Sequence, residues 1–389
     1  MLYDVAGFQS FVGVDLHKCT VTLKAVSAAG ESTGHLTIST KSVEKIERWL
    51  LALPQPVWLA VEACPFVEWF IDRYRDCVAR LDIADATELA SRRGKRRKND
   101  PNDALDIARR LARGECPLGF IADPVLMQLR KLGRHWRQLS RLISRSKHAM
   151  KSMLNAANLR GPKFDGAGAQ RWLLAQGHLL KPVQHQAFSD YLDHVLLVER
   201  QREKLRRAMH WAARSETFAQ TELLLETVPG IGDIWGLIIA AEIGPFDRFP
   251  NSDTLEFWAG LTADLKESAG RTQSGNITKA GSTTLRWALC QAAVTLCHCD
   301  ARQEAIRQRL IKRIGKAKAN VAMGRRLLRT LYAMVRDQKP YCCEQPIDRT
   351  TRLNKARAAR KPKAEQAARR KIAERYGFPQ REQLAEPAA

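Results

Sequence analysis

The amino-acid sequence predicts an α/β domain at the N-terminus, then a long helical connector and a mostly helical C-terminal domain. Three observations support this order. The first third alternates short apolar runs with segments of helical periodicity. The middle of the chain has helical periodicity throughout. The next part places two apolar helical blocks around one segment rich in Gly and Ser. A chain of 389 residues has room for two or three such domains.

The N-terminal elements are expected in the order three strands, helix, strand, helix, strand, helix. The apolar run 11–15 and the alternating run 20–26 are typical of a strand hairpin. The other strands are expected at 35–40, 56–63 and 81–86, and the helices at 42–53, 65–80 and from 98 onward. This order predicts one α/β domain over residues 1–123.

The connector, residues 124–226, is expected to form two long amphipathic helices with a break at 161–170. In the first helix, apolar residues recur every three or four positions, and basic residues occupy the other face. This basic face comprises Arg130, Lys131, Arg134, Arg137, Arg141, Arg145 and Lys147. The pattern fits an antiparallel hairpin or an intersubunit coiled coil. A face of one sign favours backbone contacts with structured RNA over a solvated spacer.

The C-terminal domain is expected at 227–345, and a basic tail follows at 346–389. The tail is rich in Ala, Arg and Lys and poor in large apolar residues, so it cannot bury a core. The segment KESAGRTQSGNITKAG, residues 266–281, separates the two helical blocks of the domain.

Composition restricts the partner and the compartment. The chain has 64 Lys and Arg against 41 Asp and Glu, a formal charge of +23, which predicts a polyanionic partner such as nucleic acid. No apolar run approaches the ~20 residues of a spanning helix, and the N-terminus lacks the pattern of a secretory signal. The nine cysteines include no CxxC pair, and we expect a cytoplasmic protein. At CHCD (297–300), which lies on an apolar helical stretch with Cys290, we expect buried, reduced thiols rather than zinc.

Four carboxylates stand out within the first domain. Asp15 ends an apolar strand, and Glu62 interrupts another. Asp100 and Asp103 begin a helix and lie three residues apart, on one face. Three of the four also have purely structural explanations. Asp100 precedes a proline, as helix caps often do, Asp103 suits the helix dipole, and Asp15 could pair with Lys18.

Taken together, the four carboxylates predict a site for two Mg²⁺ ions. Paired divalent ions in phosphoryl transfer lie ~3.5–4 Å apart and prefer oxygen ligands. Carboxylates from one helix face and two strand ends could hold such a pair. A block of basic residues directly before the helix would then bind the phosphate backbone, or would form a solvated loop. This block comprises Arg92, Arg93, Lys95, Arg96, Arg97 and Lys98.

The stretches FVGVDLHK, WLAVEA and KNDPNDALDIARRLA together resemble the N-terminal DEDD domain of insertion-sequence transposases with a Holliday-resolvase-like fold. Bridge-RNA-guided recombinases belong to that family. The resemblance implies a ribonuclease-H-like fold and places the catalytic, metal-binding acids at Asp15, Glu62, Asp100 and Asp103. The chain departs from many members after the glutamate, where CPFVEW replaces a Thr-Gly-x-Tyr-like stretch.

The second half is similar to the family's C-terminal transposase domain. The match lies in VPGIGDIWGLIIAAEIGPFDRFPNSDTLEFWAGL and ESAGRTQSGNITKAGSTTLRWALCQAA. It implies a nucleophilic serine between the two helical blocks, for which Ser268 is the best match and Ser274 the alternative. Many members have Ser-Ser-Gly-Gly where this chain has ESAG. Arg271, Lys279 and Arg286 are the candidate phosphate contacts.

The resemblance therefore implies a DNA transposase or recombinase of an insertion sequence. It would cleave and exchange strands of donor and target duplexes with Mg²⁺ and a serine nucleophile. A structured guide RNA and a homo-oligomer, dimer or tetramer, are the expected partners. Two alternatives remain: a Holliday-junction-type metal-dependent nuclease without a covalent serine step, and a non-catalytic nucleic-acid-binding protein. The serine segment distinguishes the first alternative, and metal dependence the second.

Overall fold

The computed structural model describes residues 3–86, 88–89, 100–162, 164, 166–213, 216–268, 271–279 and 281–343. Within these ranges, the side chains of 100–102, 216–217, 264–268 and 271–276 lie outside the description. The chain divides into two compact units, Met1–Ile121 and Ala122–Ala389.

The first unit is built on a mixed sheet with the strand order β3-β2-β1-β4-β5-β6. Strands β1, β4 and β5 are parallel, and the other neighbours are antiparallel. The strands are β1 (Ser10–Leu16), β2 (Thr20–Ser27), β3 (Ser32–Ser39), β4 (Val57–Glu62), β5 (Arg80–Ala84) and β6 (Leu118–Gly119). The five predicted strands are all present. The two-residue β6 was not predicted, because so short a strand leaves no periodic signal.

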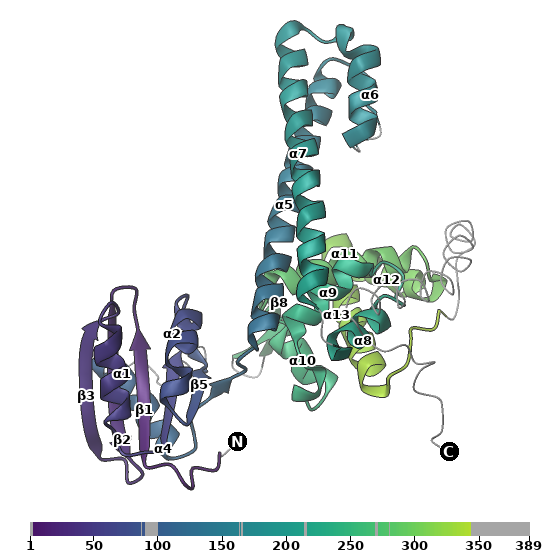
Figure 1. Cartoon of the computed structure of the whole chain (residues 1–389). Helices are drawn as coiled ribbons and strands as arrows, with labels where there is room; N and C mark the ends of the chain where they lie inside the picture. Colours follow the sequence, from purple (N-terminus) through teal and green to yellow (C-terminus); the bar gives the residue numbers. More distant parts are fainter. Residues whose placement is uncertain are drawn as a thin grey trace, which may run out of the picture. The chain divides into compact units, whose positions relative to one another are not determined.

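Helices cover both faces of this sheet. On one face, α1 (Val43–Leu51) and α2 (Val67–Tyr74) bury Ile46 and Phe70 against alternate residues of β1, including Val12 and Val14 (Figure 1). A short 3₁₀ turn, η1 (Arg75–Cys77), follows α2. On the other face, α4 (Asp100–Ala112) buries Ile107 against Phe11 and Trp58. The N-terminal unit is therefore an α/β sandwich of three layers.

The second unit begins with a helical hairpin. Helices α5 (Pro124–Ala156) and α7 (Pro182–Ala212) lie side by side, with α6 (Gly166–Gln176) and a 3₁₀ turn, η2 (Gly177–Leu179), near the tip (Figure 1). The predicted apolar face of α5 is the buried one, including Leu129 and Trp136. The hairpin is thus formed within one chain. The predicted break at 161–170 extends too far, because α6 begins at Gly166 inside it.

The remaining helices of this unit share one core. Helix α9 lies at its centre, and the residues of α9 are buried on nearly every side. They are α8 (Glu216–Leu225), α9 (Asp233–Ile243), η3 (Phe246–Arg248), α10 (Ser252–Trp258), α11 (Thr283–Cys297), α12 (Ala301–Ile314) and α13 (Lys316–Asp337). Between α10 and α11, β7 (Ala263–Ser268) and β8 (Arg271–Ile277) form an antiparallel pair. In the described part of the chain, no helix has the length and apolar character needed to cross a membrane.

A buried carboxylate joins α10 to α13. The side chain of Glu256 is completely buried and accepts hydrogen bonds from Nε of Arg325 and Nε of Arg329. Arg329 also donates from Nη2 to Oδ1 of Asp253 at 2.7 Å, although the Asp253 side chain is 76% exposed. A buried carboxylate needs such partners, because an unpaired charge in the interior is costly.

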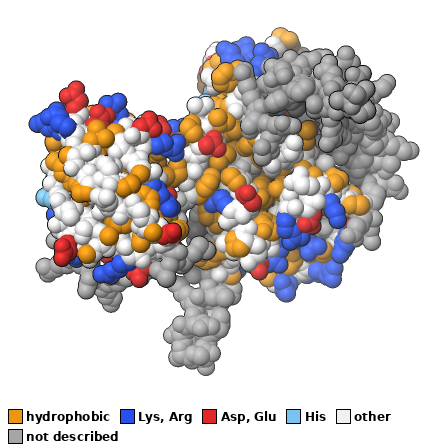
Figure 2. All heavy atoms as spheres, turned by 60° about the horizontal axis from the view of Figure 1, so that its bottom comes forward, with side chains coloured by type: hydrophobic (Ala, Val, Ile, Leu, Met, Phe, Trp, Pro, Cys, Tyr) orange, Lys and Arg blue, Asp and Glu red, His pale blue; other side chains and the backbone are white. Residues whose placement is uncertain are grey.

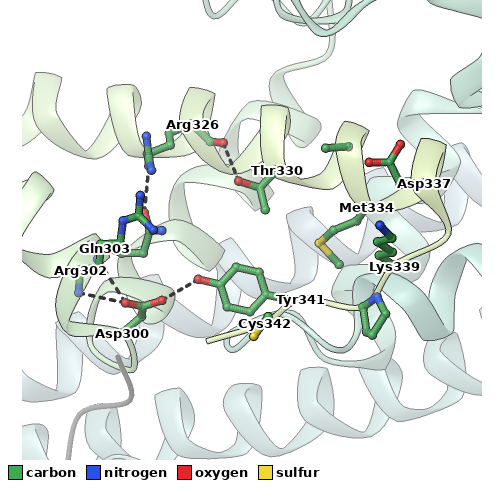
Figure 3. Close-up of a pocket in the computed structure, with 12 residues that line it drawn as sticks. Asp300, Arg302, Gln303, Arg326, Thr330, Met334, Asp337, Lys339, Tyr341 and Cys342 are labelled. Carbon is green, nitrogen blue, oxygen red and sulfur yellow. Dashed lines mark hydrogen bonds between the residues drawn. The ribbon is translucent and has the colours of Figure 1, made fainter. Parts of the chain in front are cut away.

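The CHCD segment is structural. Cys297 and Cys299 are buried, and Asp300 caps α12 by accepting hydrogen bonds from the backbone N–H groups of Arg302 and Gln303. Its other oxygen accepts a hydrogen bond of 2.7 Å from the Tyr341 hydroxyl, at the edge of a cavity of about 320 Å³ (Figure 3). Asp300 thus serves as a helix cap and as a hydrogen-bond acceptor, and the two thiols are buried as the sequence predicted.

Candidate functional site

Two of the predicted acids lie at neighbouring strand ends in the first unit. Strands β1 and β4 are parallel, and Val14 is paired with Val61. Asp15 and Glu62 follow directly, so both carboxylates lie at the carboxyl-terminal edge of the sheet. Asp15 is only 9% exposed, and Nε2 of His17 lies 3.5 Å from its Oδ2.

Both carboxylates also point to the same face of the sheet. Side chains two residues apart in a strand share a face. Phe11 on β1, and Trp58 and Ala60 on β4, belong to the core formed with α4. Asp15 and Glu62 continue these two series, so they lie on the α4 side.

The thiol of Cys64 follows closely after Glu62. Burial raises its pKa, backbone hydrogen bonds lower it, and the negative charges of Asp15 and Glu62 raise it. Both acids therefore act on one thiol, which agrees with their positions at adjacent strand ends. The edge of the sheet therefore concentrates negative charge.

Helix α4 begins at this same edge. A Cβ added to Gly13 would lie 2.0 Å from the carbonyl oxygen of Ala104 and 2.6 Å from the nitrogen of Ala108. The first turns of α4 thus lie on the end of β1 that carries Asp15. At the other end of the helix, the backbone carbonyl of Gly114 accepts a hydrogen bond from the nitrogen of Tyr3, ahead of β1. This direction places Asp103, next to Ala104, near the two strand-end acids.

These residues suit a divalent cation chemically. Asp15, Glu62 and Asp103 offer the oxygen ligands that Mg²⁺ prefers, and two of them come from rigid strand ends. Among the side chains that the structure describes, no group of three or more His, Cys, Asp or Glu is arranged to hold a metal ion. Asp100 begins α4 one turn before Asp103, but its side chain lies outside the described residues.

The predicted basic block, Arg92 to Lys98, lies outside the described residues. Figure 2 shows one face of the molecule, on which blue Lys and Arg side chains gather in groups on the second unit. On the first unit, at the left of this view, basic and acidic side chains are mixed.

The two candidate serines lie in strands rather than in a loop. Ser268 is the last residue of β7 and is paired with Arg271, and Ser274 is paired with Leu265 across the ladder. The side chains of these four residues lie outside the description. Lys279 is exposed and has a φ of 57°. The sequence did not predict this strand pair, because its polar Gly/Ser composition is typical of a loop.

Arg286 has a structural role at the base of this strand pair. Its Nη1 donates to the carbonyl oxygens of Ala259 and Gly281, at 3.1 and 3.2 Å. Burial lowers the pKa of Arg286, and the charge of Arg137 lowers it further. This proximity of two arginines was not visible in the sequence, where they are far apart.

Part of the basic face of α5 makes contacts within the second unit, although Lys131, Arg134, Arg141 and Arg145 are exposed. Arg134 forms a two-pronged ion pair with Glu242, whose side chain is 2% exposed. Arg130 donates from Nε to the carbonyl oxygen of Ala241 at 2.8 Å. Lys147 pairs with Glu199 of α7 at 3.1 Å. Part of the face predicted to meet RNA therefore holds α5 against α9 and α7, since cations suit the carbonyl end of a helix.

Family models match both halves of the chain, and both models describe transposases. A model of the DEDD transposases of the IS110 type matches residues 12–158. A second model, described as the transposase IS116/IS110/IS902 family, matches residues 222–308.

Two curated relatives extend the agreement. The protein y4qE of Sinorhizobium fredii, described as a transposase, is 24% identical over 294 residues, which span 74% of this chain and 72% of that protein. A protein of Pseudomonas aeruginosa, described as a family 20 transposase, is 28% identical over 153 residues, 38% of this chain and 44% of the relative.

Proposed function

Because the chain belongs to the IS110 family of DEDD transposases, we propose that it cleaves and exchanges DNA strands of an insertion sequence through a covalent serine intermediate. The observation that carries the proposal is the meeting of Asp15, Glu62 and the start of α4 at one edge of the sheet. Three antiparallel strands followed by parallel crossovers support a ribonuclease-H-like fold for this unit.

The proposed active site combines residues of both units. Asp15, Glu62, Asp100 and Asp103 would hold two Mg²⁺ ions, which supply charge stabilisation at the phosphate. The Ser268 hydroxyl oxygen would attack the phosphorus of the scissile phosphodiester, with Ser274 as the alternative. A serine–phosphate bond forms, and the bond from phosphorus to the leaving nucleotide oxygen breaks. Strand exchange reverses these bonds with an oxygen of the other strand.

The partners of the reaction follow from the same assignment. Donor and target DNA duplexes would be substrates, a structured RNA would guide their choice, and a homo-oligomer would hold both duplexes. The basic block from Arg92 to Lys98, together with Arg271 and Lys279, would bind backbone phosphates. We further propose the four-part division at 123, 226 and 345, in which the tail contacts nucleic acid.

A covalent-adduct assay tests the proposed site. Labelled donor DNA and candidate RNA are incubated with Mg²⁺, and serine-linked DNA and cut DNA are measured separately. We expect Asp15→Asn, Glu62→Gln and Ser268→Ala each to lower adduct formation by more than about 100-fold. Asp106→Asn is the matched control, because Asp106 lies on α4 but pairs with Arg110 at 2.9 Å. This control should keep nearly the wild-type rate.

The alternatives give different results in this assay. Cutting that survives Ser268→Ala and Ser274→Ala without any adduct would identify a nuclease that uses water. Strand exchange that is unaffected by Asp15→Asn and by removal of Mg²⁺ would show that the strand-end acids have only a structural role.

A further inference from the structure

The second unit contains a cavity of about 580 Å³ that is lined mainly by arginines. It lies where the first turns of α5 meet the end of α9 and the start of α11. The charged lining residues are Arg130, Arg134, Arg137, Arg141 and Glu242. Four guanidinium groups against one carboxylate leave this lining with an excess of positive charge.

The one carboxylate in the described part of the cavity lining, Glu242, already accepts hydrogen bonds from an arginine. Both oxygens of Glu242 accept from Arg134, at 3.0 and 3.3 Å. Arg130 donates to the carbonyl oxygens of Ala241 and Glu242. Neither set of hydrogen bonds reaches Arg137 or Arg141. The charge of Glu242 partly offsets that of Arg137, and the lining residues that the structure describes include no second acid.

Arg137 is the lining residue that has a buried hydrogen-bond donor without a partner among the described residues. Its Nη1 donates to the Thr283 hydroxyl at 2.8 Å, but its Nε is buried and has no hydrogen-bond partner among the described residues. Burial lowers the pKa of Arg137, and the charge of Arg141 lowers it further. A partly buried guanidinium group beside a second arginine favours an anion in the cavity.

The start of α11 adds a second attraction for anions. Residues Gly281 to Thr284 line the cavity, and Ser282 caps the helix by accepting from the nitrogens of Thr284 and Leu285. This helix has 15 residues, so its first turn carries the positive end of a substantial dipole. Hydroxyl donors, a helix start and planar guanidinium groups are together typical of a phosphate site.

We propose that this cavity binds a phosphodiester group of the nucleic-acid backbone. The choice of nucleic acid over a small anion rests on the proposed function and on the formal charge of +23. The bound phosphate would give the guanidinium groups of Arg137 and Arg141 an anionic partner and balance the repulsion between them.

The cavity lies at the base of the strand pair that carries the candidate serines. Trp258 lines the cavity, and just beyond it the carbonyl oxygens of Gly260 and Thr262 accept from the nitrogens of Lys279 and Thr278, which holds the base of the pair. Ser268 ends β7, about 17 Å along the strand from its first residue. If Ser268 is the nucleophile, the bound phosphate is not the one that it attacks, and the cavity positions the strand. The alternative Ser274, paired with Leu265, lies nearer the base.

Binding measurements without chemistry test this proposal. The full chain with Ser268→Ala is titrated, without Mg²⁺, against a labelled DNA duplex and against a labelled RNA over a series of salt concentrations. Arg141→Gln and the double variant Arg137→Gln/Arg141→Gln are compared with Arg200→Gln. Arg200 is an exposed arginine on α7, outside the cavity lining, and its substitution removes the same charge as Arg141→Gln.

For at least one of the two nucleic acids, we expect the double variant to bind about 10-fold more weakly or worse. The slope of log K against log salt should fall by about 1 to 2. Arg141→Gln should show part of the effect, and since its side chain is exposed, it leaves folding unchanged. Loss for DNA alone identifies a DNA phosphate, and loss for RNA alone identifies an RNA phosphate.

Equal losses in Arg141→Gln and Arg200→Gln, or unchanged binding of both nucleic acids, would overturn the proposal. The assay forms no covalent bond. A failure of the proposed serine chemistry would therefore leave the binding result unchanged, and the reverse also holds.

Discussion

Gly13 shows how one residue sets the geometry of the proposed site. Its missing side chain lets the backbone of α4 lie directly on β1, and this contact places Asp103 at the edge that holds Asp15 and Glu62. The sequence could place Asp15 and Glu62 at strand ends, because short apolar runs end there. It could not show the role of Gly13, because the helix that contacts it lies about 90 residues further along the chain.

We expect Gly13→Ala to destabilise the N-terminal unit by about 3 kcal/mol, because the added methyl group would overlap backbone atoms that cannot move independently. Urea unfolding followed by circular dichroism measures the change. Gly119→Ala is the matched control in the same sheet, since its added Cβ would meet Ile83 only at ordinary distances of 3.6 to 4.0 Å. If both variants were equally stable, the close contact between β1 and α4 would be wrong.

Among the elements, those with a strong period were predicted and those that depend on distant contacts were not. The five longer strands and the α5–α7 hairpin each have an apolar face that the sequence displays. The strand pair β7–β8 has no such face, and its pairing was missed. The basic face of α5 was predicted correctly as a stripe, but its contacts with Glu242 depend on a residue more than 100 positions away.

The ion pair between α10 and α13 provides a prediction for these elements. Glu256→Ala should lower the free energy of unfolding by about 3–5 kcal/mol, because it leaves two guanidinium groups without their buried partner. Asp253→Ala removes an exposed carboxylate from the same helix and from the same Arg329, so its cost should stay below about 1 kcal/mol. Chemical denaturation of the full chain measures both. Similar costs for the two variants would contradict the role given to burial.

The whole molecule has separate cores for its two units. The two apolar clusters of the first unit end before residue 122, and the large cluster of the second begins at Ala122. The change from α/β to helical periodicity already indicated such a division in the sequence. The sequence could not show which apolar residues share a core, because that depends on contacts between distant segments.

Separate cores predict that the units fold independently. Fragments 1–121 and 122–389, produced separately, should each give one cooperative thermal transition, since each has its own apolar cluster. Scanning calorimetry of the two fragments and of the full chain measures the transitions. A fragment 1–121 that shows no cooperative transition would mean that the first unit needs the second to fold.

The α5–α7 hairpin has a mechanical consequence. Arg137 lies at the cavity near its base, and α5 continues to Ala156 at its tip, which is about 28 Å further along the helix axis. That length corresponds to about eight base pairs of duplex DNA. Two helices packed along their length resist bending, so the hairpin acts as a rigid spacer. It keeps whatever touches its tip at a set distance from the phosphate held at its base.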